Sequence, residues 1–545
     1  MERDQLDYIL IGYNEPSFSS YEQMLSNYGK DSEAYRDLKF SFVEVDGQKL
    51  NYIDLMNYVY KQAFPNSAQK RDMFVSGEIP NLAAVYLSNH LYNKGVKGRY
   101  VNLFQYEKDK LIQYLSMNPL VIGITTTFYV LNFPVIEMVN FIREHNQNVK
   151  IVVGGPLILN HFRNYDKEGF EIALEDIGAD IYVVESQGEL TLTKVIGCLK
   201  EKGNLSSVPN LAFFENGDLI TTHVEPESNN LDENYINWMN FQEESLGHTI
   251  QTRTARSCAF NCAFCNYPTR AGKLTLTDIT TVELELDSIK KLGNVSNVVF
   301  IDDTFNVPIE RFKEICRLMI RKQYNFNWFS YFRCANADEE AIELMAESGC
   351  KGVFLGIESG APSILKNMNK AATIEKYSQG IKTLKKHGIL TFGSFIAGFP
   401  GESEETLLET TNFIKETKMD YFRAQLWYCE KGTKIDAQRE KYDISGEGFV
   451  WRHATLNSGQ AMDYLERLQQ EIEDSQWLPQ WSFDFWIIPY LLGKGVTLEQ
   501  FKAFMIGANS LMSLNFVDLN KEVRIEIERK QMSTLIKEMA AWKVI

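Results

Sequence analysis

The pattern of apolar and polar positions changes twice along the chain and divides it into three parts. Up to about residue 225, short continuous apolar runs alternate with stretches of helical periodicity such as 134–145 and 189–203. Apolar strands separated by helices are typical of a parallel sheet covered on both faces. The strand candidates are DYILIGY (7–13), LVIGITT (120–126), KIVVGG (150–155) and DIYVVES (180–186). We therefore predict an open, doubly wound, Rossmann-like α/β domain over residues 1–225, interrupted by an unassigned polar and aromatic insertion at about 17–75.

A second βα series occupies residues 248–439, after a polar, acidic stretch at 226–247 that is predicted to be a linker with little core. Its helical segments, such as 282–293 and 339–349, separate six strand candidates. The candidates are 248–256, 297–303, 327–333, 352–358, 389–398 and 421–428. Six strand-helix units with right-handed crossovers predict a partial (β/α)6 barrel, in which chemistry gathers at the carboxyl ends of the strands.

The third part, residues 440–545, is predicted to be a helical domain, because its apolar positions follow a helical period in three long segments. These segments are 462–474, 498–514 and 521–542. The part also holds four of the eight tryptophans around the sequence WSFDFWIIPY. That aromatic cluster can form an ordinary core or a wall that faces a substrate, and both interpretations stay open.

Charge and composition narrow the class of protein. The 545 residues include 72 acidic and 56 basic side chains, for a net charge of −16, so no general field attracts nucleic acid or anionic lipid. The first residues, MERDQLDYILIG, lack the apolar core of a signal peptide, and no apolar run reaches 18 residues. We expect a cytoplasmic, folded protein, and the eight cysteines are too few for a disulfide scaffold.

Three of these cysteines, Cys258, Cys262 and Cys265, stand within eight residues in RSCAFNCAFCNYP, directly after the first strand of the second series. Three thiolates can ligate three corners of one metal centre. A structural zinc site needs a fourth ligand, and no second cysteine pair exists in the sequence. A [4Fe-4S] cluster ordinarily takes four cysteines, so three leave one iron open for another ligand. The spacing therefore predicts a metal centre that performs chemistry.

The C-x3-C-x2-C spacing, with Phe264 before the last cysteine, resembles the cluster loop of radical S-adenosylmethionine (SAM) enzymes. The resemblance implies a [4Fe-4S] cluster on Cys258, Cys262 and Cys265, SAM chelated to the fourth iron, and a 5′-deoxyadenosyl radical. It also implies an electron donor such as flavodoxin or ferredoxin. Zinc binding or a disulfide is the weaker alternative.

Later strand ends resemble the SAM contacts of this superfamily. The implied residues are Phe264, Asp302, Asp303, Arg333, Glu358, Ser359 and Gly398. Four of them also have a plain structural interpretation: the two aspartates can cap a helix, Arg333 can form a salt bridge, and the glycine can form a tight turn. In YCEKGT, Lys431 replaces the proline that related enzymes often have, which puts the sixth-strand contacts in doubt. Tyr428 and Cys429 are weak catalytic candidates, and a buried structural cysteine is the commoner case.

The first domain, placed before such a barrel, resembles the cobalamin (B12)-binding domain of cobalamin-dependent radical SAM proteins. Its polar loops follow three strands and form a shallow crevice in which cobalamin can bind. The residues implied are Thr125, Thr126, Thr127, Gly154, Gly155, Pro156, Ser186, Gln187, Gly188 and Glu189. The Asp-x-His-x-x-Gly motif is absent, so no histidine ligand to cobalt is implied by that route. A domain that binds nothing is the alternative.

Over most of its length the chain resembles the PhpK-like group of P-methyltransferases, through IGYNEPSF, TTTFYVLNFP and FDFWIIPYLLGKG. The resemblance implies methyl transfer from methylcobalamin to an unactivated carbon or a phosphinate phosphorus of a small molecule or peptide. Two alternatives stay open. One is a cobalamin-binding enzyme of a non-methylating radical cyclisation or rearrangement, and the other is a non-catalytic sensor. Neither nucleic acid nor membrane is expected as a partner.

Overall fold

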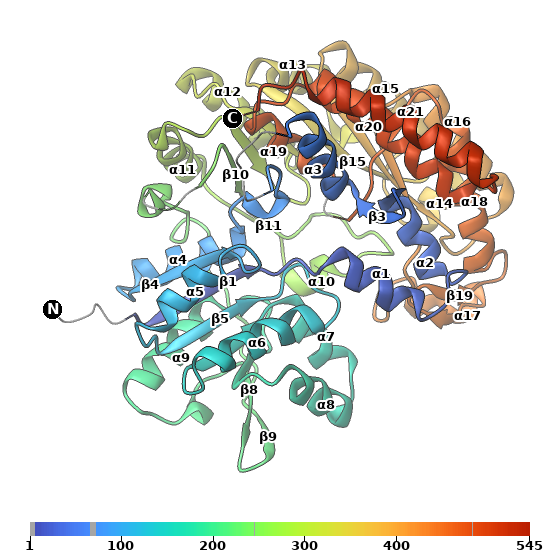
Figure 1. Cartoon of the computed structure of the whole chain (residues 1–545). Helices are drawn as coiled ribbons and strands as arrows, with labels where there is room; N and C mark the ends of the chain where they lie inside the picture. The colour runs from blue at the N-terminus through green and yellow to red at the C-terminus, as the bar shows by residue number, and fades with distance from the viewer. Residues whose placement is uncertain (1–5, 66–71, 243, 245, 482, 545) are drawn as a thin grey trace. The chain divides into compact units, whose positions relative to one another are not determined.

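The computed structural model describes residues 6–65, 72–242, 244, 246–481 and 483–544 (Figure 1). It divides into two compact units. The N-terminal unit contains the chain up to Pro16, Gly77–Leu246 and Thr275–Gly293, and the C-terminal unit contains Ser17–Ser76, Gly247–Leu274 and Asn294–Ile545. Each unit is described separately below.

The N-terminal unit is built on a seven-stranded sheet of order β4-β1-β5-β6-β7-β8-β9. The strands are β1 (Tyr8–Tyr13), β4 (Gly98–Leu103), β5 (Val121–Thr125), β6 (Lys150–Gly154), β7 (Ile181–Val183), β8 (Leu211–Glu215) and β9 (Asp218–Thr221). The first five strands pair in parallel, which confirms the predicted parallel sheet. The last two pair antiparallel and were not predicted. Their turn at Asn216-Gly217, with both residues at positive φ, is a typical two-residue hairpin turn.

Helices cover both faces of this sheet. On one face the core combines strand residues such as Ile122 and Val153 with α5 (Lys108–Leu115), α6 (Phe133–His145), α7 (Pro156–Asn164) and α8 (Lys167–Ile177). On the other face, α4 (Leu82–Asn93) contacts β1, β4 and α9 (Glu189–Lys200). The unit is therefore doubly wound, as its continuous apolar strands predict.

Residues 226–247 differ from the predicted linker because they bury apolar side chains of their own. Leu231, Ile236 and Trp238 are almost fully buried within the N-terminal unit. The backbone N–H of Trp238 donates to Ser288 Oγ at 3.1 Å on α11 (Ile279–Leu292). The stretch is polar in composition, but its few apolar residues dock on one helix.

The C-terminal unit contains the predicted barrel strands. The sheet order is β10-β13-β14-β15-β16-β17-β20, and every consecutive pair is parallel. The strands are β10 (Thr249–Thr252), β13 (Asn297–Phe300), β14 (Asn327–Phe332), β15 (Cys350–Glu358), β16 (Leu390–Ala397), β17 (Tyr421–Leu426) and β20 (Gln476–Trp477). The six predicted strands are all present, and β20 adds a short seventh. No pairing joins β10 to β20 among the described residues, so the barrel is partial.

The insertion at 17–75 belongs to the C-terminal unit. It forms α1 (Phe18–Ser26), α2 (Glu33–Leu38), the hairpin of β2 (Phe42–Val45) and β3 (Gln48–Asn51), and α3 (Tyr52–Ala63). These elements pack on the C-terminal helices α18 (Ser458–Glu471), α20 (Leu498–Met512) and α21 (Lys521–Met539). The hydroxyl of Tyr52 donates to Asn509 Oδ1 at 2.8 Å, and both side chains are buried.

The aromatic sequence before α19 (Ile487–Gly493) enters the barrel. Phe485 is fully buried, and its ring lies 5.6 Å from Phe392 and 6.0 Å from Phe354. Trp486 keeps accessible surface and contacts Tyr331 and Phe354, with ring centroids 4.8 and 6.5 Å away. The cluster is therefore core at Phe485, while Trp486 adds accessible aromatic surface.

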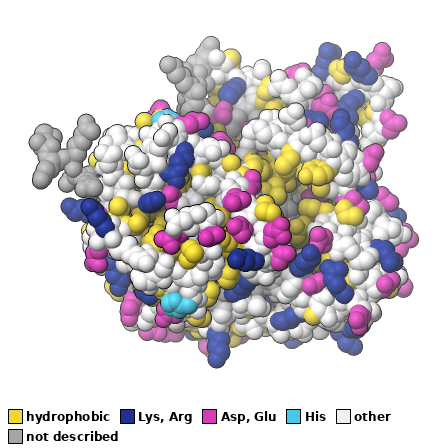
Figure 2. Space-filling view, turned by 90° about the horizontal axis from the view of Figure 1, so that it is seen from below, with side chains coloured by type: hydrophobic (Ala, Val, Ile, Leu, Met, Phe, Trp, Pro, Cys, Tyr) yellow, Lys and Arg dark blue, Asp and Glu magenta, His cyan; other side chains and the backbone are white. Residues whose placement is uncertain are grey.

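The charged surface has no large region of a single sign on the face drawn in Figure 2, where acidic and basic side chains are interspersed. In the described part of the chain, no helix is both long enough and apolar enough to span a bilayer.

The docking of the insertion can be tested at Tyr52. Tyr52→Phe leaves Asn509 Oδ1 buried without its donor, which costs about 1–3 kcal/mol. We expect a lower urea midpoint followed by tryptophan fluorescence, because seven of the eight tryptophans lie in the C-terminal unit. Tyr28→Phe, at a 76% exposed tyrosine of the same insertion, is the control. Equal midpoints for both variants would contradict the docking.

Candidate functional site

The three clustered cysteines lie on the loop that follows the first barrel strand, and all three are free thiols. Backbone hydrogen bonds hold this loop: Ala263 N–H donates to Met368 O at 2.8 Å, and Ile435 N–H donates to Ala263 O at 3.0 Å. The loop is therefore fixed against segments that follow β15 and β17. Burial raises the pKa of the Cys265 thiol, and the nearby Cys262 and Cys258 raise it further.

Glu339, Glu343 and His387 form a second group of possible metal ligands, and their ligand atoms lie within 4.8 Å of one another.

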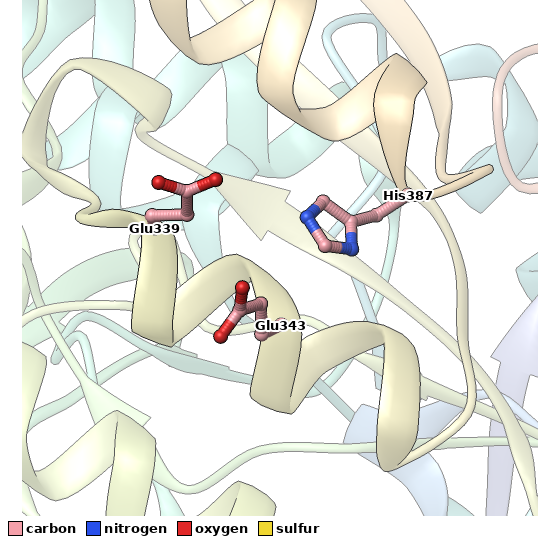
Figure 3. A group of neighbouring side chains, drawn as sticks. All are labelled: Glu339, Glu343 and His387. Atoms are coloured by element: carbon pink, nitrogen blue, oxygen red, sulfur yellow. The ribbon is translucent and has the colours of Figure 1, made fainter.

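The group of Glu339, Glu343 and His387 has a simpler explanation than a metal ion. Figure 3 shows the two carboxylates on one helix, α13 (Glu339–Glu347), with the imidazole on a neighbouring segment. Both carboxylates are exposed, and Glu339 accepts a hydrogen bond from Lys386 Nζ at 2.9 Å. We interpret this group as a surface ion-pair cluster.

A network of charged and aromatic side chains surrounds the cluster loop. The guanidinium of Arg333 lies 3.6 Å from the ring centroid of Phe260, and its Nη2 donates to Lys370 O. Lys370 in turn donates to Glu358 Oε1 at 2.8 Å, and Lys370 Nζ lies 5.5 Å from the Phe264 ring centroid. Four predicted site features, the loop, Phe264, Arg333 and Glu358, are thus brought together. Arg333 Nε is buried without a hydrogen-bond partner, as expected of a group that awaits a ligand.

The two aspartates after β13 have different environments. Asp302 is buried and accepts hydrogen bonds from the N–H of Thr254 and of Ala255 and from the Thr254 hydroxyl. Its oxygens hold the chain after β10. Asp303 keeps accessible surface, but the surrounding protein desolvates its carboxyl, and this with the neighbouring Asp302 raises its pKa to about 7. Asp303 is therefore the better placed of the two to meet a ligand.

Two other predicted SAM contacts are engaged in local structure. Ser359 is fully buried, and its hydroxyl oxygen accepts from Ala361 N–H at 3.1 Å. Gly398 has φ +87°, and an added Cβ would meet Trp451 at 2.3 Å, so packing alone requires this glycine. The backbone N–H groups of Gly398 and Phe399 both donate to Glu402 Oε2. Their contacts with SAM stay predictions.

The weak catalytic candidates follow β17. Tyr428 is 47% exposed. Cys429 is buried, and its sulfur contacts Arg439 Nη2 at 3.4 Å and Gly446 O at 3.7 Å. Desolvation raises the pKa of the Cys429 thiol. The Cys429 sulfur therefore contacts the strand β18 (Ser445–Glu447), while the Tyr428 side chain remains accessible.

In the N-terminal unit, the predicted cobalamin residues lie at the carboxyl ends of β5, β6 and β7. The Thr126 hydroxyl and backbone N–H both donate to Gly154 O at 3.0 Å, and the Thr125 hydroxyl donates to Gly12 O at 2.8 Å. Gly155 has φ +117°, and a Cβ there would meet Thr126 Oγ1 at 2.7 Å. Thr125, Thr126, Gly154 and Gly155 therefore form one compact edge, beside Thr127 and Pro156.

The loop after β5 also exposes apolar side chains. Phe128 is 62% exposed, Val130 74% and Leu131 42%. Three exposed apolar side chains on one loop are unusual unless they meet a ligand or a partner.

The third group of predicted residues, Ser186–Glu189, is held by residues of the polar stretch 226–247. Gln187 Nε2 donates to Glu227 O at 2.8 Å, and Asn229 Nδ2 donates to Glu189 Oε2 at 2.7 Å. Glu227 accepts from two backbone N–H groups at the start of α9. The side chains of Gln187 and Glu189 are therefore engaged, and Ser186 and Gly188 lie beside them.

Several residues around the cluster loop escaped sequence reasoning. Lys370 contacts Glu358 and Phe260 contacts Arg333, whereas Glu402 accepts from the backbone N–H of Gly398, four residues before it. Lys370 follows the short helix α14 (Pro362–Asn367) in an ordinary polar stretch, so its sequence carries no signal. Phe260 lies between the cysteines, and Glu402 lies in FIAGFPGES beside the predicted contact Gly398.

Comparison with known proteins decides the class of the barrel. Residues 252–414 match the family model of the Radical SAM superfamily. The chain carries a radical SAM domain. Such a domain implies a [4Fe-4S] cluster and SAM, in agreement with the three cysteines of the loop. The radical SAM class predicted from the cysteine spacing is thereby confirmed.

Relatives extend the similarity over most of the chain. An uncharacterised methyltransferase of Pyrococcus horikoshii is 27% identical over 380 residues, which cover 68% of this chain and 80% of that protein.

Two solved structures share the fold of this chain. One is the radical SAM methyltransferase TsrM of Kitasatospora setae, with cobalamin and [4Fe-4S] cluster bound. Its TM-score with this chain is 0.59 at 16% sequence identity, and the match covers 84% of this chain and 96% of the TsrM chain. The cobalamin-dependent radical SAM enzyme OxsB with aqua-cobalamin gives 0.57 at 14% identity and covers 90% of both chains. At these identities the likeness shows the fold.

The metal centre can be tested at Cys262. After anaerobic reconstitution with iron and sulfide, the unaltered protein is expected to hold about four iron atoms per chain. Cys262→Ala removes one of three ligands and should lose most of this iron and the visible absorbance. Cys198→Ala, at a free cysteine of the N-terminal unit, should retain both. Full iron retention by Cys262→Ala would refute the assignment.

Glu402 gives a pH-dependent prediction. Burial raises the pKa of its carboxyl from 4.5 to about 8, so the folded state favours the protonated form. As pH rises through this interval the unfolded chain ionises first, and this group lowers stability progressively. Glu402→Gln cannot ionise. We expect its thermal midpoint to rise relative to the unaltered protein between about pH 5 and about pH 9.

Glu405→Gln, at an exposed residue of α16 (Glu404–Thr417), the helix that begins just after Glu402, is the matched control and should show no such trend. A pH-independent difference for Glu402→Gln would show that Glu402 ionises normally in the folded protein.

Proposed function

We propose that this radical SAM enzyme is a cobalamin-dependent methyltransferase that moves a methyl group to an unactivated carbon or a phosphinate phosphorus of a small molecule. The observation that carries the proposal is the edge formed by Thr126, Gly154 and Gly155 in a doubly wound unit of the same chain as the cysteine loop. Structures with bound cobalamin share this fold over most of the chain, which supports the proposal.

The residues of the N-terminal unit fit a flat, amide-rimmed cofactor. Two hydroxyls and two glycines at the carboxyl ends of β5 and β6 allow close approach, and Phe128, Val130 and Leu131 offer apolar surface. His161, the only histidine of α7, is buried and hydrogen-bonds Asn132 Oδ1 at 2.8 Å. Its imidazole is thus engaged within the protein, in keeping with the missing histidine motif.

The residues of the C-terminal unit fit the cluster and SAM. The three thiols hold the cluster, Arg333 offers a guanidinium for a carboxylate, and Asp303 offers a carboxyl for an ammonium group. When bound, the cluster supplies an electron for reductive cleavage of SAM, and cobalamin supplies a transferable methyl group. The chain positions these groups and excludes water from the reacting atoms.

The two cofactors can be counted separately. We expect about four iron atoms and about one cobalt atom per chain after anaerobic reconstitution with iron, sulfide and hydroxocobalamin. Phe128→Asp places a charge on the exposed loop and should lower cobalt without changing iron. Ile172→Asp, at a 58% exposed apolar residue of α8, is the matched control and should change neither. Iron without cobalt in the unaltered protein would contradict the cobalamin assignment.

Product mass then tests the reaction. With SAM, a reductant and substrate, methylation adds one methyl group to the product, whereas a radical cyclisation removes hydrogen atoms. Cobalt binding with SAM cleavage but no gain of a methyl group would replace methyl transfer by the non-methylating alternative. Ligand binding without SAM cleavage would favour a sensor.

A further inference from the structure

A buried arginine without hydrogen bonds lies inside the barrel of the C-terminal unit. Arg423 is in β17, 8% exposed, and neither its Nε nor its Nη1 has a hydrogen-bond partner. Its guanidinium lies 5.7 Å from the ring centroid of Phe392, which faces the barrel interior beside Phe485. Burial of an unpaired guanidinium is costly, so such a group points to a ligand.

Three side chains on the inward face of the barrel keep accessible surface. Tyr331 of β14, Phe354 of β15 and Gln425 of β17 are partly exposed, while the residues next to them along each strand are mostly buried. The rings of Tyr331 and Phe354 lie 4.9 Å apart, and Trp486 contacts both. The interior therefore combines accessible aromatic surface with one unpaired cation.

Three carboxylates act on this cation without contacting it: Asp37, Asp484 and Glu358, of which Glu358 already accepts a hydrogen bond from Lys370. Asp37 comes from α2 of the insertion, and Asp484 comes from the aromatic segment before α19. Both are among the charges that act on Arg423, and both keep accessible surface. Desolvation raises the pKa of Asp37 to about 6 and also raises that of Asp484, although the charge of Arg423 opposes both shifts.

The arrangement restricts the ligand. An anion with two oxygens can pair with the free N–H groups of Arg423 in a bidentate manner. An isolated anion would also be repelled by Asp37 and Asp484 when these are ionised, and an ammonium group on the same ligand removes that repulsion. The aromatic side chains suit an apolar portion of the ligand.

We propose that the barrel interior binds the zwitterionic head of a small substrate, with its two-oxygen anion on Arg423 and its ammonium group between Asp37 and Asp484. This inference deepens the proposed function and rests on it. Free amino acids and amino-phosphinic acids carry such a head, and they share the recognised chemistry. An internal residue of a peptide carries neither charge and is excluded.

Matched ligands test the two charges separately. The probes are L-phenylalanine, its phosphinic analogue 1-amino-2-phenylethylphosphinic acid, 3-phenylpropionate, phenethylamine and N-acetylphenylalanine amide. Binding to the reconstituted full-length protein is measured by calorimetry. At least one zwitterion should bind about tenfold or more tightly than the fragments that lack one or both charges, because each charged hydrogen bond is worth about tenfold or more. Comparison of the two zwitterions distinguishes a carboxylate from a phosphinate.

Variants assign the contacts. Arg423→Gln should weaken both the zwitterions and 3-phenylpropionate by about tenfold or more, and leave phenethylamine unchanged. Asp484→Asn should weaken the ammonium-bearing probes instead. Arg467→Gln, at a surface arginine paired with Glu404, is the control and should change nothing. Thermal midpoints and iron content verify that the variants fold. Arg423→Lys keeps the charge and is a second test: it should bind the zwitterions with an affinity between those of the unaltered protein and Arg423→Gln.

Three results would overturn the inference: no binding of either zwitterion at millimolar concentration, equal binding of N-acetylphenylalanine amide, or unchanged affinity in Arg423→Gln. SAM cleavage and cobalt content are measured on the same preparations. A preparation with cobalt and SAM cleavage but without zwitterion preference refutes only this inference. Zwitterion binding without cobalt refutes the proposed function and leaves the substrate head assigned.

Discussion

Parallel pairing of consecutive strands is the constraint on which the functional unit depends. From β10 to β17 the strands of this sheet pair in parallel in their chain order, so every carboxyl end lies on the same edge. The cysteine loop, Asp303, Arg333 and Glu358 all lie at or just after such ends. Residues more than 100 positions apart, such as Phe260 and Lys370, can therefore surround one loop without any local sequence preference for doing so.

The interior of the same barrel shows how a large aromatic core and a charged group coexist. Phe485 fills the space between β14, β15 and β16, whereas the neighbouring Trp486 and Tyr331 of β14 keep accessible surface. Arg423 occupies this setting with three carboxylates acting on it but none in contact. Burying an unpaired cation there raises the free energy of the folded protein. Such unpaired groups are usual where a bound ligand completes their hydrogen bonds.

Residues 17–75 show a second role of tertiary context. They interrupt the first α/β domain in sequence, yet their core lies with the C-terminal helices, where Tyr52 meets Asn509 and Phe40 meets Trp477. Through α2 they also contribute Asp37 to the charges around Arg423. The stretch 226–247 behaves in a similar way: its polar composition indicates a linker, but Trp238 docks on α11 and Glu227 holds the start of α9.

The sequence by itself determined the parallel sheets and the six barrel strands, because strand periodicity is a local signal, and its cysteine spacing predicted the radical SAM class. It missed β4 and the hairpin of β8 and β9, whose strands mix polar with apolar residues. It also did not distinguish Asp302 from Asp303 as the residue that meets SAM. The hydrogen bonds that Asp302 accepts from Thr254 and Ala255 distinguish them, and these appear only in the structure. Lys370, Glu402 and the unpaired state of Arg423 were decided by tertiary structure alone, since burial and the absence of a partner depend on residues distant in the chain.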